Sequence, residues 1–296
     1  MKARGSMGLR GWLGASDRAA LGRKFPGAFQ APLAGRAIGL ALLTLALGVF
    51  LAGLWWLDFS VAKLWLGAGR LVDFVLLMVP PDAQTWAQAS TYLRSLGETM
   101  AIALLGTLGA ALIALPLSIF GTAAVVRSWL LRWPARRMFN TISGIDTLIW
   151  ALIWINVVGL GPFAGVLAVM TSDLGALGRL FSETLEAADP KPMEGVDSTG
   201  GGTLLRIRFG LMPQVMPVMA SQVLYFFESN TRSATIIGIV GAGGIGAHLS
   251  EQIRLLEWQQ VSFIVALILA AVMTIDAISS RLRRTMIGRT QAKDWP

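Results

Sequence analysis

The 296-residue sequence contains no cysteine and a single histidine, His248. The absence of cysteine excludes disulfides, thiolate metal sites and a cysteine nucleophile. One imidazole cannot form the common histidine-rich metal sites, so no metal site is expected. The sequence also lacks a G-x-x-x-x-G-K-[ST] phosphate-binding loop and a serine nucleophile elbow. We therefore expect that this chain binds no cofactor of its own and is not an enzyme.

Charge is scarce as well. Charged residues make up 14% of the chain and hydrophobic residues 54%, a surplus that exceeds what one globular core can bury. Uncharged stretches about as long as a bilayer core is thick alternate with short segments that hold nearly all the charge. The composition excludes a soluble fold and predicts an all-α, polytopic membrane protein.

Six membrane-spanning helices are predicted, at about 37–57, 99–120, 143–160, 161–180, 210–228 and 259–280. The first is bounded by Arg36 and Asp58 and ends in an interfacial tryptophan pair. Its apolar region is longer and further from the N-terminus than that of a cleaved signal peptide, so we expect it to be retained. In the second span, Gly106, Ala110 and Ala114 form a row of small residues that permits close helix packing.

Lysine and arginine are unevenly distributed between the predicted loops. Of the 25 such residues, 20 lie in segments on one side of the membrane and 5 on the other. The positive-inside rule places both termini in the cytoplasm, and this asymmetry accounts for the net charge of +8 without a nucleic-acid partner. A seventh crossing at 61–79 would conflict with it, so we expect that segment to lie at the membrane interface, followed by a second short external helix at 84–96.

Polar residues gather at the predicted external end of the fifth span, at Glu228, Asn230, Arg232 and Ser233. Glu228 and Arg232 are four residues apart and could pair along the helix. Alternatively, Asn230 and Arg232 could offer hydrogen-bond donors to a passing oxyanion, and the four residues would line a substrate path. Asp146 and Asp276 lie near helix ends, whereas Asp173 is deeper in the fourth span and has no explanation at this stage.

A glycine-rich segment follows, in which Gly241, Gly243 and Gly246 match G-x-G-x-x-G. A dinucleotide site requires this motif after a strand and within a βαβ unit, whereas here it follows a membrane helix. We therefore expect these glycines, with Gly244, to form a kinked or re-entrant gating segment. A plain tight turn is the alternative.

The predicted cytoplasmic segment 183–213 is too long for a simple connection. Glu194, Gly200 and Pro213 match the E-A-A, G and L-P spacing of the coupling loop in permease subunits of ABC importers, with Gly195 and Val196 where two alanines are usual. An apparent E-A-A at 186–188 is rejected, because Pro192 stands where the glycine belongs.

Several segments of the chain resemble the phosphonate-transport (PhnE-like) permease subunits of ABC importers. They are 158–168, 188–200, 211–217, 227–246 and 253–261. The resemblance covers roughly 60–285 and implies a homodimeric pore in the bacterial inner membrane. It further implies two cytoplasmic ATP-binding subunits, which would hold ATP and magnesium, and an external solute-binding protein. Phosphonate is the implied substrate, and phosphite, hypophosphite or phosphate would suit the same chemistry.

The chain is thus expected to divide into four parts: a basic cytoplasmic segment (1–35), the first span with external interfacial helices (36–98), the importer transmembrane domain (99–285) and a cytoplasmic tail (286–296). Two rival classes are disfavoured. A secondary transporter driven by an ion gradient would show internal repeats and polar residues at mid-depth. A membrane-embedded enzyme would need a nucleophile, metal cluster or acid–base pair.

Overall fold

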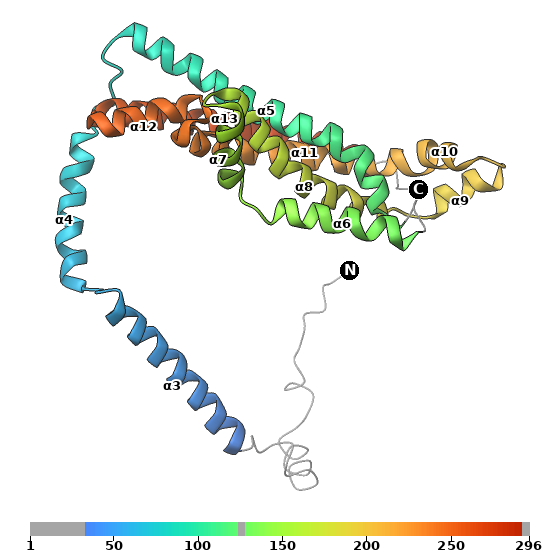
Figure 1. Ribbon diagram of the computed structural model, residues 1–296, viewed down its shortest axis with the longest axis horizontal. Helices are drawn as coiled ribbons and strands as arrows, with labels where there is room; N and C mark the ends of the chain where they lie inside the picture. Colours follow the sequence, from blue (N-terminus) through green and yellow to red (C-terminus); the bar gives the residue numbers. More distant parts are fainter. Residues whose placement is uncertain (1–32, 124–127, 292–296) are drawn as a thin grey trace, which may run out of the picture. The chain divides into compact units, whose positions relative to one another are not determined.

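The computed structural model describes residues 33–123 and 128–291 (Figure 1). All regular secondary structure in these two ranges is helical. Four described helices are long and apolar enough to cross a bilayer, and two bent helix pairs raise the number to as many as six. The predicted all-α membrane fold is confirmed. Most of the predicted N-terminal segment (1–32) and the end of the tail (292–296) lie outside the described residues.

The chain forms two compact units, 1–73 and 74–296. The first contains α3 (Leu33–Trp56), whose stretch Ala37–Trp56 is long and apolar enough to be a span, and most of α4 (Val61–Leu77). Helix α4 has 17 residues, exposes all of its side chains and is not among the candidate spans. Its length and charged face suit the predicted interfacial position.

The second unit begins with α5 (Trp86–Gly121), one helix of 36 residues. The hydroxyl oxygen of Thr85 accepts the backbone N–H of Gln88 and caps the first turn. The prediction of a separate external helix at 84–96 is therefore wrong. No proline lies between Trp86 and Thr99, and the single Gly97 in that stretch is tolerated within a helix, so nothing stops the first turns from continuing into the span.

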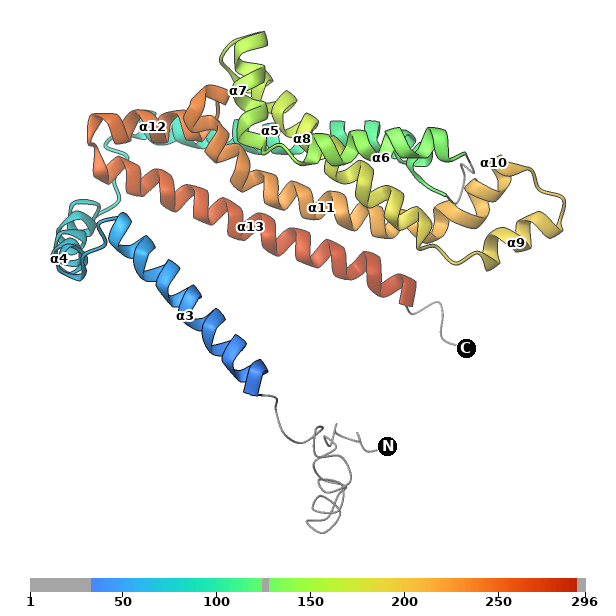
Figure 2. The same ribbon diagram turned by 60° about the horizontal axis from the view of Figure 1, so that its bottom comes forward.

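The core of this unit is formed by α5, α8 (Pro162–Glu186), α11 (Met212–Ile237) and α13 (Trp258–Gln291), which run side by side (Figure 2). The predicted small-residue row allows α5 and α8 to approach closely. A Cβ atom on Gly106 would lie 2.6 Å from the Val169 side chain, and Ala110 and Ala114 are completely buried. The row therefore serves packing.

The predicted span at 143–160 corresponds to part of a bent pair of helices and not to one long helix. The chain instead forms α6 (Trp129–Ser143) and α7 (Thr147–Val158), which meet at 89°. Asp146 lies at the corner, where its Oδ1 accepts the backbone N–H of Leu148 at 2.8 Å and caps α7. With 12 residues, α7 is roughly 18 Å long and too short to cross a bilayer alone.

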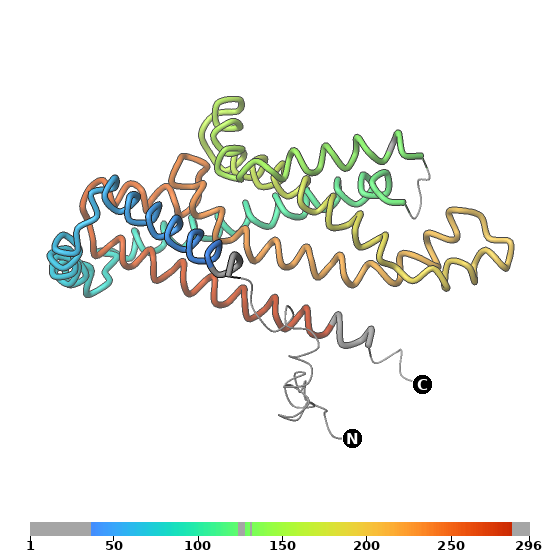
Figure 3. Tube along the Cα trace, turned by 90° about the horizontal axis from the view of Figure 1, so that it is seen from below, coloured from blue at the N-terminus to red at the C-terminus, as the bar shows by residue number. Residues whose placement is uncertain are grey.

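The predicted fifth span is also longer than expected. After α9 (Lys191–Ser198), the chain is helical from Thr203 through α10 (Thr203–Leu205), the π-helix η2 (Arg206–Leu211), α11 and the π-helix η3 (Gly238–Ala242), which is kinked at Gly241. It then bends by 61° into α12 (Ile245–Leu255). Helix α12 and the α9–α10 region lie at opposite ends of the bundle (Figures 1 and 3).

Candidate functional site

Helices α9 and α10 form an arm that projects from one end of the bundle (Figure 1). Within it, α9 packs against η2 without space for an extra methyl group, since a Cβ atom on Gly210 would lie 2.9 Å from the Cα of Met193. Arg206 and Asp197 add an ion pair at 3.5 Å. The arm is therefore a packed pair of helical segments, not an extended loop.

The base of the arm is fastened to the start of α11. The backbone N–H of Asp189 donates to Oε1 of Gln214 at 3.1 Å, and Nε2 of Gln214 donates to the backbone oxygens of Asp189 and Gly210 at 3.2 and 2.6 Å. Gln214 was not predicted from the sequence, although it follows Pro213 of the proposed motif directly. Its hydrogen bonds connect the segment just before α9 to the start of α11.

The coupling-loop candidates lie on this arm or at its base. Glu194 is in the first turn of α9, and both Glu194 and Gly195 are exposed, while Val196 is half-buried. Gly200 has a φ of +79°, in the left-handed region that glycine adopts without a steric cost. Pro213 is exposed at the second residue of α11. These positions leave one side of α9 accessible to a partner.

The charged residues of α11 pair with α13. An Nη2 donor of Arg283 lies 2.8 Å from Oε2 of Glu228, and Arg232 lies 3.5 Å from Asp276. The first pair is largely buried, with side-chain exposures of 14% and 24%, whereas the second is about half exposed. The Glu228–Arg232 pair predicted along the helix is therefore not formed, because the antiparallel α13 brings an opposite charge to each partner.

The predicted depth of these residues is wrong too. Arg283 lies 25 residues after Trp258, or roughly 37 Å along α13. Its partner Glu228 consequently lies far from the α12 end of the bundle, which was expected to be external. The reason is that the helix continues past residue 228 as far as the kink at Gly241.

A buried polar cluster joins α5, α8 and α11. Asn230, Asp173 and Thr107 have exposed fractions of 4%, 3% and 0%. The side-chain amide of Asn230 donates to Oδ2 of Asp173 and to Oγ1 of Thr107, the latter at 2.8 Å. This explains Asp173, whose depth was unexplained from sequence. It also means that Asn230 could contact a passing anion only if this cluster opened.

Ser233, the fourth residue of the predicted substrate path, is half-buried. Its hydroxyl lies 3.5 Å from the backbone oxygen of Ser229, one turn earlier. Of the four candidates, Arg232 is thus the most exposed polar group on α11. The structure does not bring all four together at one surface.

The glycine segment forms the bend between η3 and α12. Gly241, Gly243 and Gly244 have φ values of 110°, 80° and 71°, a conformation that other residues adopt only with strain. Gly246 packs against Gly238, because a Cβ atom on Gly246 would lie 2.9 Å from the Cα of Gly238 and would overlap the backbone oxygen of Thr235. These contacts pack the start of α12 directly against the end of α11 and the start of η3.

Two hydrogen bonds attach the bend to the rest of the bundle. The backbone N–H of Gly161 donates to the oxygen of Gly241 at 3.0 Å, and that of Ile245 donates to Oγ1 of Thr99 at 2.8 Å. The bend is thereby fixed to the start of α8 and to α5.

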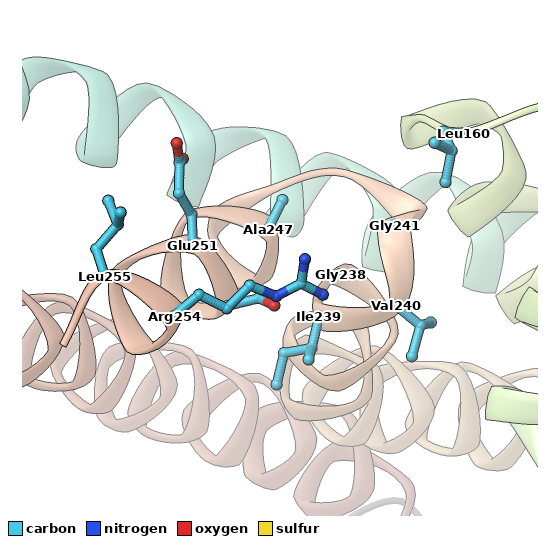
Figure 4. A pocket seen from close by; sticks show the side chains of 10 residues that line it. Leu160, Gly238, Ile239, Val240, Gly241, Ala247, Glu251, Arg254 and Leu255 are labelled. Atoms are coloured by element: carbon cyan, nitrogen blue, oxygen red, sulfur yellow. The ribbon is translucent and has the colours of Figure 1, made fainter.

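An open cavity of about 460 Å³ lies beside this bend (Figure 4). Leu160, Gly238 and Gly241 contribute to its lining from one side, and Ser250 and Arg254 from α12. The side chain of Arg254 extends toward Gly238 and Ile239, while that of Glu251, which also lines the cavity, points away from Gly238 (Figure 4). Arg254 was not predicted to have a role, because a single arginine in an external loop carries no distinguishing pattern.

The amino-acid sequence is similar to those of known transport proteins. The chain is 40% identical to HtxC of Stutzerimonas stutzeri, whose name describes a phosphite transport system permease, over 75% of this chain and 77% of that protein. It is 47% identical to PhnE2 of Escherichia coli K12, named for a cryptic phosphonate transport system permease, over 41% of this chain and all of that protein.

Solved structures agree on the fold. The permease of the methionine ABC transporter MetNI, in an inward-facing conformation, aligns with a TM-score of 0.60 at 16% identity, over 69% of this chain and 99% of that one. Residues 114–289, more than half of the chain, match the model of one family. This chain is a membrane permease subunit that belongs to the binding-protein-dependent transport system inner membrane component family of ABC importers.

Proposed function

We propose that this chain forms the translocation path for phosphonate, or for a related phosphorus oxyanion, in an ATP-driven importer. The observation that carries the proposal is the similarity to permeases named for phosphite and phosphonate transport, which extends over three quarters of the chain in HtxC. Phosphite, hypophosphite and phosphate are alternatives, because each is a tetrahedral anion that a guanidinium can bind.

The second part of the proposal concerns the partners. Two copies of this chain form the pore, and two cytoplasmic ATP-binding subunits, which hold ATP and magnesium, dock on the α9–α10 arms. Both termini are then cytoplasmic, and an external solute-binding protein delivers substrate at the α12 end. The accessible side of α9 and the fastening of its base to α11 through Gln214 support this arrangement. Glu194, Gly195, Val196, Gly200 and Pro213 are the proposed coupling positions.

The substrate path is proposed to follow α11. Arg232 is about half exposed on this helix within the bundle, and a charge at membrane depth is costly unless it faces water or a partner. Glu228, Asn230 and Ser233 would support this position, Glu228 through its contact with α13. The bend at Gly241, Gly243, Gly244 and Gly246 would serve as the gating segment at the other end of α11.

Transport in proteoliposomes tests the proposal. The permease is reconstituted with its ATPase subunits, and uptake of radiolabelled phosphonate, phosphite and phosphate is measured with the solute-binding protein on the outside. ATP-dependent uptake of at least one of these anions is expected. Uptake without ATPase subunits, driven by an ion gradient, would contradict the importer mechanism. A requirement for a second, different permease chain would contradict the homodimer.

A further inference from the structure

A polar cavity of about 270 Å³ lies between α6 and α8. Both helices extend toward the end of the bundle that carries the α9–α10 arm (Figure 1). It is lined by Arg136, Phe139, Asn140, Arg179, Ser182 and Glu183. Its floor is buried, since Phe139 and Ser182 have exposed fractions of 0% and 2%. The two arginines, one from each helix, bring two positive charges to its walls, and Glu183 brings one negative charge.

The two arginines differ in how firmly they are held. Arg136 forms an ion pair with Glu186, and its Nε donates to the backbone oxygen of Gly121 at 2.8 Å. Arg179 lies 3.9 Å from Glu183, and both of these side chains are at least half exposed. An exposed pair at this distance contributes little to stability. Arg136 is therefore structural, while the guanidinium of Arg179 can turn toward an anion.

Exposed apolar side chains precede the cavity on α6, three to seven residues before Arg136. Trp129, Leu130 and Trp133 have exposed fractions of 61%, 76% and 50%, and the guanidinium of Arg137 lies 5.7 Å from the ring centre of Trp133. Tryptophan beside arginine at the end of a membrane helix is typical of the bilayer interface. An occupant that suits both features has a negative head group and hydrocarbon chains; a free phosphate ion would satisfy the arginines alone.

We propose that this cavity binds the head-group phosphate of an anionic phospholipid, with Arg179 as its principal contact and with the acyl chains along Trp129, Leu130 and Trp133. Basic pockets between membrane helices on the cytoplasmic side are suited to such head groups. The lipid would bridge α6 and α8 directly before α8 ends at Glu186 and the arm begins. The site is separate from the proposed substrate path and does not depend on it.

Lipid binding to the intact complex tests the site. The permease with its ATPase subunits is purified in detergent, phosphatidylglycerol or phosphatidylcholine is added, and bound lipid is counted by native mass spectrometry. We expect phosphatidylglycerol to bind more tightly than phosphatidylcholine. Arg179→Gln should weaken phosphatidylglycerol binding about fivefold, the effect of roughly one basic residue near a lipid surface. Glu183→Gln removes the competing carboxylate and should strengthen it.

A matched control and a competitor decide between the sources of the anion. Arg284→Gln makes the same charge change on an exposed residue of α13, outside the cavity, and should leave binding unchanged. The proposal is overturned if Arg179→Gln and Arg284→Gln have the same effect, or if the two lipids bind equally. Displacement of phosphatidylglycerol by inorganic phosphate alone would overturn the lipid assignment, because it would show that the site binds phosphate without any contribution from acyl chains.

Discussion

The carboxylate of Glu228 accepts a hydrogen bond from the guanidinium of Arg283 at 2.8 Å, and this contact joins two helices across 55 residues of sequence. Both side chains are less than a quarter exposed. Glu228→Gln would leave Arg283 without its counter-charge in a site largely shielded from water, at an expected cost of about 2 kcal/mol in the free energy of unfolding. Thermal unfolding of the purified permease measures this loss.

A second pair between the same helices provides the control. Arg232 and Asp276 are about half exposed and 3.5 Å apart, so Asp276→Asn should cost less than about 1 kcal/mol. The double variant Glu228→Leu with Arg283→Met should regain much of the stability, because it leaves no uncompensated charge. If Glu228→Gln and Asp276→Asn lower the free energy of unfolding equally, burial does not determine how much each ion pair contributes to stability.

The buried amide of Asn230 gives a second prediction. Asn230→Leu keeps a similar size but removes the hydrogen-bond donor shared by Asp173 and Thr107. Leaving a buried acceptor without its partner is expected to cost about 1 to 3 kcal/mol. The Asn230→Leu variant should therefore unfold at a lower temperature. The control is Thr274→Val, which removes an exposed hydroxyl of α13 and should leave the unfolding temperature unchanged. If Asn230→Leu leaves the unfolding temperature unchanged, the cluster does not hold the three helices together.

Local patterns made part of this fold predictable. The excess of apolar residues and the spacing of charges identified the membrane helices, because a span needs only a continuous stretch of suitable length. The row from Gly106 to Ala114 predicted close packing, and the small residues do lie against α8. Each of these signals is contained within one segment of the chain.

The failures concern relationships between segments. Hydropathy gives the length of an apolar stretch but not the direction of its helices, so the predicted span at 143–160 did not reveal the 89° bend between α6 and α7. The partners of Glu228 and Asp173 lie 55 and 57 residues away in sequence. A spacing of four residues allowed a local pair between Glu228 and Arg232 as one of two alternatives, but the packing of α13 against α11 gave each charge a different partner.

The third prediction concerns the arm. Gly210→Ala would place a Cβ atom 2.9 Å from the Cα of Met193 and push α9 away from η2. If α9 couples the permease to its ATPase, transport should fall about tenfold, which corresponds to roughly 1.4 kcal/mol of lost docking energy. Substrate-stimulated ATP hydrolysis and uptake, measured in the same proteoliposomes, report the loss of coupling.

The control for the arm is Gly195→Ala, which changes a proposed coupling position to the alanine that is usual in the coupling loops this segment resembles. No heavy atom lies within 4 Å of a Cβ atom there, and alanine should favour the short helix by up to about 1 kcal/mol. Transport should therefore be kept or improved. A Gly210→Ala variant that transports as well as Gly195→Ala would show that the contact between α9 and η2 is not needed for coupling.

The last prediction concerns the bend between η3 and α12. Gly246→Ala would bring a methyl group against the backbone oxygen of Thr235 and the Cα of Gly238, neither of which can rotate away. Overpacking of this kind typically costs about 1 to 3 kcal/mol, so the bend should open and uptake should fall, with a lower unfolding temperature. Gly97→Ala is the matched change, since it lies in α5 with no heavy atom within 4 Å of the added Cβ and should be neutral or slightly stabilising. Identical uptake and unfolding temperatures for the two variants would mean that the bend tolerates a side chain at Gly246 and that close backbone contact is not what shapes it.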